Sequence, residues 1–273
     1  DHCTHRLNFT CGPKNTLLLT LREVGQSEGN SKDLDKLDWS LQLANKELTE
    51  FSHAINHDLR SPMRAMRTIP EWIQTDLEAV LGEIPTEIQS HIEMLQKQAN
   101  RLEAMLEDLL TYAQVGHTGI ELQPVSLLTV LLQIQRELDL PIGFTIELPD
   151  QNRQLYVPEE ELRLALRKLI ENAFRHHHSQ DSGHVVVEIS DSANTLHLRV
   201  IDDGPGIPEQ HHQTALTVFS TLHSRDQQEG SGMGLSIAKK IVTNWGGKLS
   251  IHTGLEQRGT CIALSIPADR CAA

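Results

Sequence analysis

The chain has 273 residues, of which 38% are hydrophobic and only 4% are aromatic. This length allows one large or two ordinary domains. The formal net charge is −13, from 24 Lys and Arg against 37 Asp and Glu. Because an acidic surface is repelled by phosphate backbones and by anionic lipids, nucleic acid and an anionic membrane are unfavourable as main partners.

No apolar run approaches the roughly 20 residues needed to span a bilayer, and no signal peptide is visible. The four cysteines show no C-x-x-C spacing, which suits free thiols in a reducing cytoplasm. We therefore expect a cytoplasmic location and no membrane segment in this stretch. Because the sequence opens on Asp1 rather than Met, we expect a fragment of a longer chain, in which a membrane attachment elsewhere stays open.

Residues 5–10 and 16–22 are predicted to form two short strands around the turn Gly-Pro-Lys-Asn. A lone hairpin is too small to fold by itself. We therefore interpret residues 1–24 as the end of an upstream sensor domain of the PAS type. The polar stretch 25–33 is predicted to be a linker or a helix start.

Two long helices are predicted next, each with an apolar seam that alternates steps of three and four residues. Prolines at 62 and 70 are expected to interrupt the first helix, which ends near Ala79. Pairing two such hairpins into a four-helix bundle buries the seams, so we expect a homodimer, although a plain coiled-coil spacer explains them equally well. The seams consist of Leu34, Leu37, Leu41, Ala44, Leu48, Phe51 and Ile55, and of Ile88, Ile92, Leu95, Ala99, Leu102, Leu106, Leu109 and Ala113.

The stretch FSHAINHDLRSP at 51–62 carries His57 beside Asp58, followed closely by Ser61. His57 lies two residues past the seam residue Ile55, so it is predicted to face solvent. An exposed histidine taken alone is usually plain surface. The pattern H-D-x-R-x-P resembles the phosphoacceptor box of sensor histidine kinases, with Ser61 where the common version has Thr.

From the joint at Gly116 and Gly119 the pattern changes to alternating helices and strands. Helices are predicted at 127–138, after Pro158 and at 233–244, and strands at 144–148, 184–190, 195–201, 248–253 and 260–266. Such a pattern predicts an α/β sandwich with its helices on one face of the sheet.

Three motifs in this half resemble those of the GHKL ATP-binding fold. The first, LRKLIENAFRH at 166–176, carries Asn172, whose amide oxygen suits a Mg²⁺ shell, and Arg175, whose positive charge suits a phosphate. The second, VIDDGPGI at 200–207, places an aspartate and two glycines directly after a strand. The third, GSGMGL at 230–235, exposes backbone N–H groups at a helix start to phosphate. Phe219 and the polar run 220–229 are expected to form a mobile lid.

The resemblance to sensor histidine kinases covers about residues 34–268 and implies an α+β protein. A helical-hairpin linker and dimerisation domain (25–118) precedes a Bergerat-type ATP-binding domain (119–273). It implies ATP and Mg²⁺ as cofactors, a response-regulator partner, catalytic roles for His57, Asp58 and Ser61, and a metal role for Asn172. It implies ATP-binding roles for Asn172, Arg175, His176, Asp202, Gly204, Gly206, Ile207, Phe219, Gly230, Gly232, Gly234, Leu235 and Thr260.

The motifs depart from the family at Ser61, at Lys168 in place of an Asn, and at Leu222 in place of a Phe. A hydrolytic GHKL ATPase and a non-catalytic dimeric scaffold remain as alternatives. Against hydrolysis, Lys168 stands where those enzymes carry a general-base Glu. The histidines at 176–178, 211 and 212 are interpreted as solvated surface rather than as a metal site, with His176 alone at the nucleotide pocket.

Overall fold

The computed structural model describes residues 4–12, 16–24, 58–59, 61–116, 121–140, 142–179, 182–192, 195–221, 231–254 and 258–271. The chain divides into two compact units, residues 1–51 and 52–273. The first unit contains the antiparallel strands β1 (Thr4–Gly12) and β2 (Thr16–Val24), which confirms the predicted hairpin. The first predicted seam and its linker lie outside the described residues.

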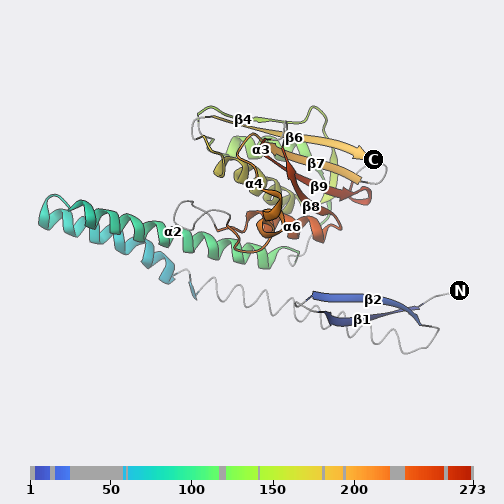
Figure 1. Ribbon diagram of the computed structural model, residues 1–273, viewed down its shortest axis with the longest axis horizontal. Helices are drawn as coiled ribbons and strands as arrows, with labels where there is room; N and C mark the ends of the chain where they lie inside the picture. Colours follow the sequence, from blue (N-terminus) through green and yellow to red (C-terminus); the bar gives the residue numbers. More distant parts are fainter. Residues whose placement is uncertain are drawn as a thin grey trace. The chain divides into compact units, whose positions relative to one another are not determined.

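The second unit begins with a helical hairpin. A helix over residues 61–81 and α2 (Thr86–Gln114) are joined by a turn in which Gly82 has φ +76°, and they lie side by side (Figure 1). Arg67 of the first helix pairs with Glu103 of α2 at 3.3 Å. The expected interruption is wrong at Pro70, since the helix continues through that position. Pro62 lies in the first turn of this helix, and the residue at position 60 lies outside the described residues. Pro70 is buried, and burial of its apolar ring offsets part of the lost hydrogen bond.

Two rows of apolar side chains remain exposed on this hairpin. Within each row the residues are seven apart, so they share one face of their helix. On α2, by contrast, the seam residues Ile92 and Ala99 are buried. Of the eight predicted α2 seam residues, four are therefore exposed, two are buried and two, Leu106 and Ala113, are half-buried. The exposed rows are Leu59, Met66, Ile73 and Val80, and Ile88, Leu95, Leu102 and Leu109.

The rest of the unit is built on a five-stranded sheet with the order β4-β6-β7-β9-β8. Its strands are β4 (Phe144–Glu147), β6 (Gly183–Ser192), β7 (Thr195–Asp202), β8 (Lys248–Thr253) and β9 (Thr260–Pro267). Only the β4–β6 pair is parallel. Burial alternates along β4 and over most of β6 and β7, as expected for a sheet with one covered face.

Three helices cover that face (Figure 1). They are α3 (Leu127–Glu137), α4 (Glu159–Arg175) and α6 (Gly234–Asn244). Their buried residues and those of the strands form one continuous hydrophobic core. The predicted one-sided α/β sandwich is therefore confirmed.

Several short elements were not predicted. Strands β3 (Gln123–Ser126) and β5 (Gln154–Val157) form a separate antiparallel pair, and each is too short to show a periodic pattern. The side chain of Ser126 caps α3 by accepting a hydrogen bond from the Thr129 N–H at 3.2 Å. The remaining elements are η1 (Glu209–His211), α5 (His212–Ala215) and η3 (Ala268–Arg270).

The C-terminal end of α2 packs against the five-stranded sheet and its covering helices, which together are called the sheet unit. Val115 is buried in the core of that unit. The Lys240 ammonium of α6 donates to the Tyr112 carbonyl at 2.5 Å and lies 4.6 Å from the centre of the Tyr112 ring. This helix end is therefore held on α6 by both apolar packing and a cation.

A buried carboxylate completes this contact. Glu161, in the first turn of α4, accepts hydrogen bonds from the Trp245 indole N–H at 2.9 Å and from the Gly116 N–H at 3.0 Å. Gly116 has φ +83°, and a Cβ there would lie 2.3 Å from the Asn244 amide nitrogen. Gly116, the first residue of the expected joint, is thus hydrogen-bonded and closely packed, and Gly119 lies outside the described residues. Within the described ranges, every helix is too polar or too short to pass through a lipid bilayer.

The adjacent glutamates of α4 provide a test of this interaction. Glu161→Ala should lower the free energy of unfolding by about 2–4 kcal/mol, because two buried donors lose their acceptor. The matched control is Glu160→Ala, which removes a side chain that is 80% exposed and pairs with Arg163; its cost should stay below about 1 kcal/mol. Urea unfolding followed by tryptophan fluorescence measures both values, and equal losses would contradict the role given to Glu161.

Candidate functional site

Asp202, at the end of β7, is buried and joins two strand ends. Its Oδ1 atom accepts hydrogen bonds from the Gly204 N–H and from the Thr260 N–H, each at 3.0 Å. Burial raises the pKa of Asp202, and the hydrogen bonds from Thr260 and Gly204 only partly oppose that rise. The carboxylate is therefore fixed in orientation between the turn after β7 and the start of β9.

The glycines around Asp202 are required by close backbone contacts. Gly206 has φ +78°, and a Cβ there would lie 2.9 Å from the Gly259 carbonyl oxygen. Gly259 has φ +69°, and its Cβ would lie 1.7 Å from the Asp202 carbonyl oxygen. Ile207 then packs against the core from a half-buried position. The spacing D-x-G-x-G-I thus corresponds to a turn that interlocks with the turn before β9.

Asn172, Arg175 and His176 lie at the C-terminal end of α4. Asn172 is half-buried and Arg175 is exposed. Neither side chain has a hydrogen-bond or ion-pair partner among the residues that the structure describes. His176 caps the helix, with its N–H donating to the Asn172 carbonyl at 3.2 Å. An amide and a guanidinium are thus available to a ligand here.

The third motif leads into α6. The Ser231 hydroxyl accepts a hydrogen bond from the Met233 N–H at 3.1 Å, just before the helix begins at Gly234. Gly232 has φ +70°, and a Cβ there would lie 2.6 Å from the Ser220 carbonyl oxygen. The N–H groups that open a helix carry partial positive charge, which suits phosphate oxygens. Leu235 is buried, whereas Gly230 and the expected lid at 222–229 lie outside the described residues.

Phe219 precedes this region and adopts an unusual backbone. Its φ of +61° is the only positive value of a non-glycine residue in the described part of the chain. A bulky side chain in this conformation is strained. The ring is 42% exposed, so it is open to contact with another group.

An acidic residue of α2 reaches the third motif. Asp108 Oδ1 pairs with the Lys168 ammonium at 2.7 Å, and its Oδ2 accepts a hydrogen bond from the Ser231 hydroxyl. The Asp108 side chain is only 14% exposed. This cluster could not be predicted from the sequence, because its members are distant in the chain and follow no local pattern.

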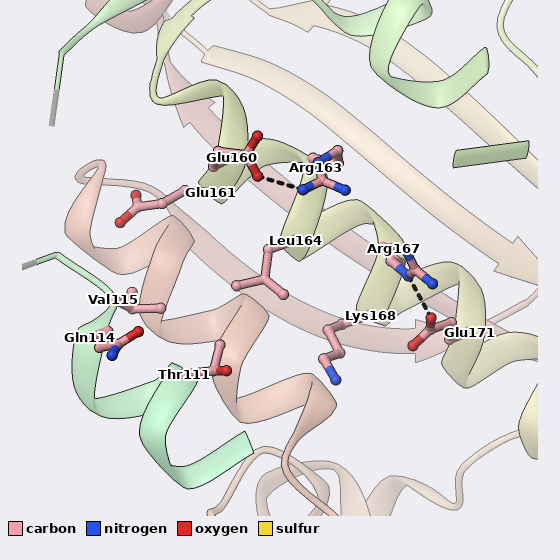
Figure 2. Close-up of a pocket in the computed structure, with 10 residues that line it drawn as sticks. All are labelled: Thr111, Gln114, Val115, Glu160, Glu161, Arg163, Leu164, Arg167, Lys168 and Glu171. Carbon is pink, nitrogen blue, oxygen red and sulfur yellow. Dashed lines mark hydrogen bonds and ion pairs between the residues drawn. The ribbon is translucent and has the colours of Figure 1, made fainter. Parts of the chain in front are cut away.

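A cavity of about 530 Å³ lies beside this cluster, between the end of α2 and α4. Figure 2 shows two ion pairs within α4 at its wall, Arg163 with Glu160 and Arg167 with Glu171. The second pair, at 2.7 Å, holds the Glu171 carboxylate beside a guanidinium. Lys168, the third cation that lines the cavity, pairs with Asp108 of α2 and not with a glutamate of α4.

The histidine run after α4 is not uniformly solvated, and that interpretation is wrong for His177. The His177 side chain is 4% exposed, and its Nε2 lies 3.1 Å from Asp203 Oδ1. Its ring packs edge-on against Phe144 and stacks on His178. For Asp203, burial favours a higher pKa, but the His184 N–H and the nearby His177 outweigh it, so the pKa is lowered. His177 therefore fixes the loop after α4 to the turn after β7.

The phosphoacceptor motif lies at the start of the hairpin. Asp58 and Ser61 are helical and exposed. His57 lies outside the described residues. Among the predicted site residues, the structure thus brings Asp202, Gly204, Gly206 and Thr260 together through hydrogen bonds and close backbone contacts, and it leaves the histidine motif on a different element.

Two family profiles match the chain. The His Kinase A (phospho-acceptor) domain, HisKA, matches residues 47–118, and HATPase_c, the histidine kinase-, DNA gyrase B- and HSP90-like ATPase, matches residues 158–270. Together they cover the hairpin and most of the sheet unit.

Individual relatives match most of this chain. Cyanobacterial phytochrome B of Nostoc sp. is 27% identical over 233 residues, 81% of this chain and 30% of its own length. Sensor protein kinase PmrB of Pseudomonas aeruginosa is 27% identical over 216 residues, 77% of this chain and 44% of its own length. The crystal structure of full-length ShkA in complex with AMPPNP shares the fold, with a TM-score of 0.54 and 21% identity over 80% of this chain and 45% of that one.

This chain thus spans less than half the length of each of these three relatives. Both profiles nevertheless occur in one chain and in one order, phosphoacceptor domain first and ATPase domain second. The helical hairpin and the one-sided α/β sandwich agree with that order. The chain belongs to the sensor histidine kinases.

Proposed function

We propose that this chain transfers the γ-phosphoryl group of ATP to His57 and then to an aspartate of a response-regulator partner. One combination of observations carries the proposal. The H-D box, of which Asp58 is helical and exposed, precedes in the same chain a sheet unit whose buried Asp202 is held by two backbone N–H groups among tightly packed glycines.

The nucleotide roles follow from the chemistry of each residue. Asp202 is oriented to accept a hydrogen bond from the adenine amino group, and Gly204 and Gly206 leave room for the base. Asn172 and Arg175, which have no partner among the described residues, are suited to the metal and the phosphates. The other proposed contacts are His176, Ile207, Phe219, Gly230, Gly232, Gly234, Leu235 and Thr260.

The donor set at Asn172 fits Mg²⁺, which is bound by few protein oxygens and otherwise by phosphates and waters. When bound, Mg²⁺ neutralises charge on the phosphates of ATP. The protein contributes an amide oxygen from a helix that is fixed in the core by its buried face. Arg175 adds a positive charge one turn further along the same helix.

The transfer step forms one bond and breaks one bond. The neutral imidazole of His57 attacks the γ-phosphorus in line, a P–N bond forms, and the bond to the β–γ bridging oxygen breaks as ADP leaves. Asp58 holds the imidazole tautomer and stabilises its positive charge. The phosphoryl group then passes from the imidazole nitrogen to a carboxylate oxygen of the partner. Ser61 is proposed to position a group beside His57.

Two contacts favour this reaction over ATP hydrolysis. Lys168, at the position of a hydrolytic general base, is paired with Asp108, and a protonated amine cannot accept a proton. Glu171, the nearest alternative carboxylate in sequence, is bound by Arg167. Water therefore lacks an activating base on α4, which leaves His57 as the competent nucleophile.

The exposed heptad rows support a homodimer. In a single chain they leave eight large apolar side chains uncovered on one hairpin. A second copy has the same rows, and pairing the two hairpins into a four-helix bundle buries them. We also propose that residues 1–24 belong to an upstream sensor domain, that 25–118 and 119–273 are separate domains, and that the setting is cytoplasmic.

His57→Gln tests the reaction. With γ-labelled ATP and Mg²⁺, the parent chain should acquire label that is lost in acid and kept in base, as expected for a phosphoramidate. The variant should acquire none, while it still binds ATP and still dimerises. ATP consumption by the parent should stop near one phosphate per His57 when no regulator is present, because no base activates water. Sustained hydrolysis by the variant at the parental rate would support the ATPase alternative.

Asn172→Ala tests the metal role. The variant should lose about tenfold in ATP affinity with Mg²⁺ present, the effect of about 1.4 kcal/mol, and should change little when EDTA removes the metal. Asp202→Asn is the comparison, and it should weaken binding under both conditions because the base contact needs no metal. Calorimetric titration gives both constants, and equal losses for Asn172→Ala with and without Mg²⁺ would contradict a metal ligand.

Leu102→Glu tests the dimer. It places a charge in the centre of an exposed heptad row, and burying that charge in a bundle is unfavourable. The variant should shift from dimer to monomer in light-scattering chromatography. Asn100→Glu, which adds the same charge at an exposed α2 position on the opposite side of the helix from Leu102, should leave the dimer intact. A dimeric Leu102→Glu chain would exclude this row from the interface.

A further inference from the structure

Asp108 on α2 binds two residues that belong to the nucleotide-binding half of the chain. Its two oxygens are engaged separately, Oδ1 by the Lys168 ammonium at 2.7 Å and Oδ2 by the Ser231 hydroxyl. All three side chains are largely withdrawn from solvent: Asp108 is 14% and Lys168 23% exposed, and Ser231 is buried. Charge-assisted hydrogen bonds in such a setting are stronger than those between neutral groups.

Lys168 lies close to the residues proposed to bind the nucleotide. It precedes Asn172 by four residues, so the two side chains share one face of α4. Its side chain also lies near the end of the glycine-rich loop, since a Cβ at Gly234 would lie 3.8 Å from Lys168 Cδ. A flexible four-carbon stem lets its ammonium reach groups on more than one side. It lies between the residue proposed for the metal and the loop proposed for the phosphates.

We propose that Lys168 is a phosphate ligand of the nucleotide site and that Asp108 competes with the triphosphate for its ammonium. This inference rests on the proposed function. In the structure described here the ammonium neutralises Asp108. When ATP is bound, the more highly charged phosphates attract the same ammonium, and Asp108 loses its counter-ion. Nucleotide binding and the attachment of α2 to the glycine-rich loop are therefore mutually unfavourable.

The remaining α2 contacts define where the helix is released. Tyr112 binds Lys240 one turn after Asp108, and Gly116 binds Glu161 a further turn along. Neither of these contacts involves Lys168 or Ser231. Loss of the Asp108 contact thus separates α2 from the glycine-rich loop, while the Glu161 contact still holds the end of α2. ATP binding therefore controls, at Asp108, whether α2 stays attached to the glycine-rich loop.

The competition predicts opposite effects for the two members of the ion pair. Asp108→Asn should tighten binding of the non-hydrolysable analogue β,γ-imido-ATP with Mg²⁺ by about three- to tenfold, because the ammonium is no longer held by a carboxylate. Lys168→Gln should weaken it by about tenfold, the loss of one charge-assisted contact. The double variant should behave like Lys168→Gln, within about twofold, because Asp108 acts only through Lys168.

Calorimetric titration of the intact chain measures these constants. Glu107→Gln and Lys248→Gln, two exposed charges on α2 and β8, are the matched controls and should bind the analogue like the parent. Adenosine, which lacks phosphate, should bind all variants equally. Thermal unfolding of each variant should show one cooperative transition, and a chain that fails to fold is replaced by Lys168→Met or Asp108→Ser at the same position.

The outcomes separate this inference from the proposed function. If Asp108→Asn and Lys168→Gln change affinity in the same direction, the pair is only a structural contact and the proposal is wrong. Unchanged affinity in both variants, with normal binding by the parent, also overturns it and leaves the proposed kinase function intact. No binding of the analogue by the parent chain would overturn both. Equal shifts for adenosine and the analogue would show that phosphate is not what Lys168 binds.

Discussion

The carboxylate of Glu161 links three segments that are far apart in sequence: the end of α2, the first turn of α4 and the end of α6. Because the acid is buried, it is stable only while both N–H groups donate to it. That requirement fixes where α2 leaves the sheet unit. It also brings Asp108, two turns earlier on α2, to Lys168 and Ser231.

The proposed nucleotide site contains a second buried acid, and the sequence pattern predicted the turn around it. Asp202 and the glycines after it were identified from motif spacing, since a turn with so little space leaves few residue types, and Thr260 was identified from the family resemblance. The one-sided sandwich was also predictable, because its helices and most of its strands are long enough to show a period. Both are local constraints, so they leave a readable trace in the chain.

Contacts between distant segments left no such trace. Glu161 is one of three acids in the first turn of α4, yet it differs from Glu160 by its burial against Trp245. His177 was grouped with its solvated neighbours, although Asp203 and Phe144 enclose it. The helix through Pro70 was missed because tertiary packing outweighed a local propensity. The pair β3–β5 was missed because each strand has only four residues and shows no period.

The central claim, that ATP phosphorylates the histidine beside Asp58, is tested most directly by locating the phosphate. The chain is incubated with ATP and Mg²⁺, digested with trypsin at alkaline pH, and the peptide of residues 47–60, which contains both His53 and His57, is fragmented by tandem mass spectrometry. The account predicts phosphate on His57. Phosphate on His53 or on a serine, or an unmodified peptide after ATP has been consumed, would contradict it.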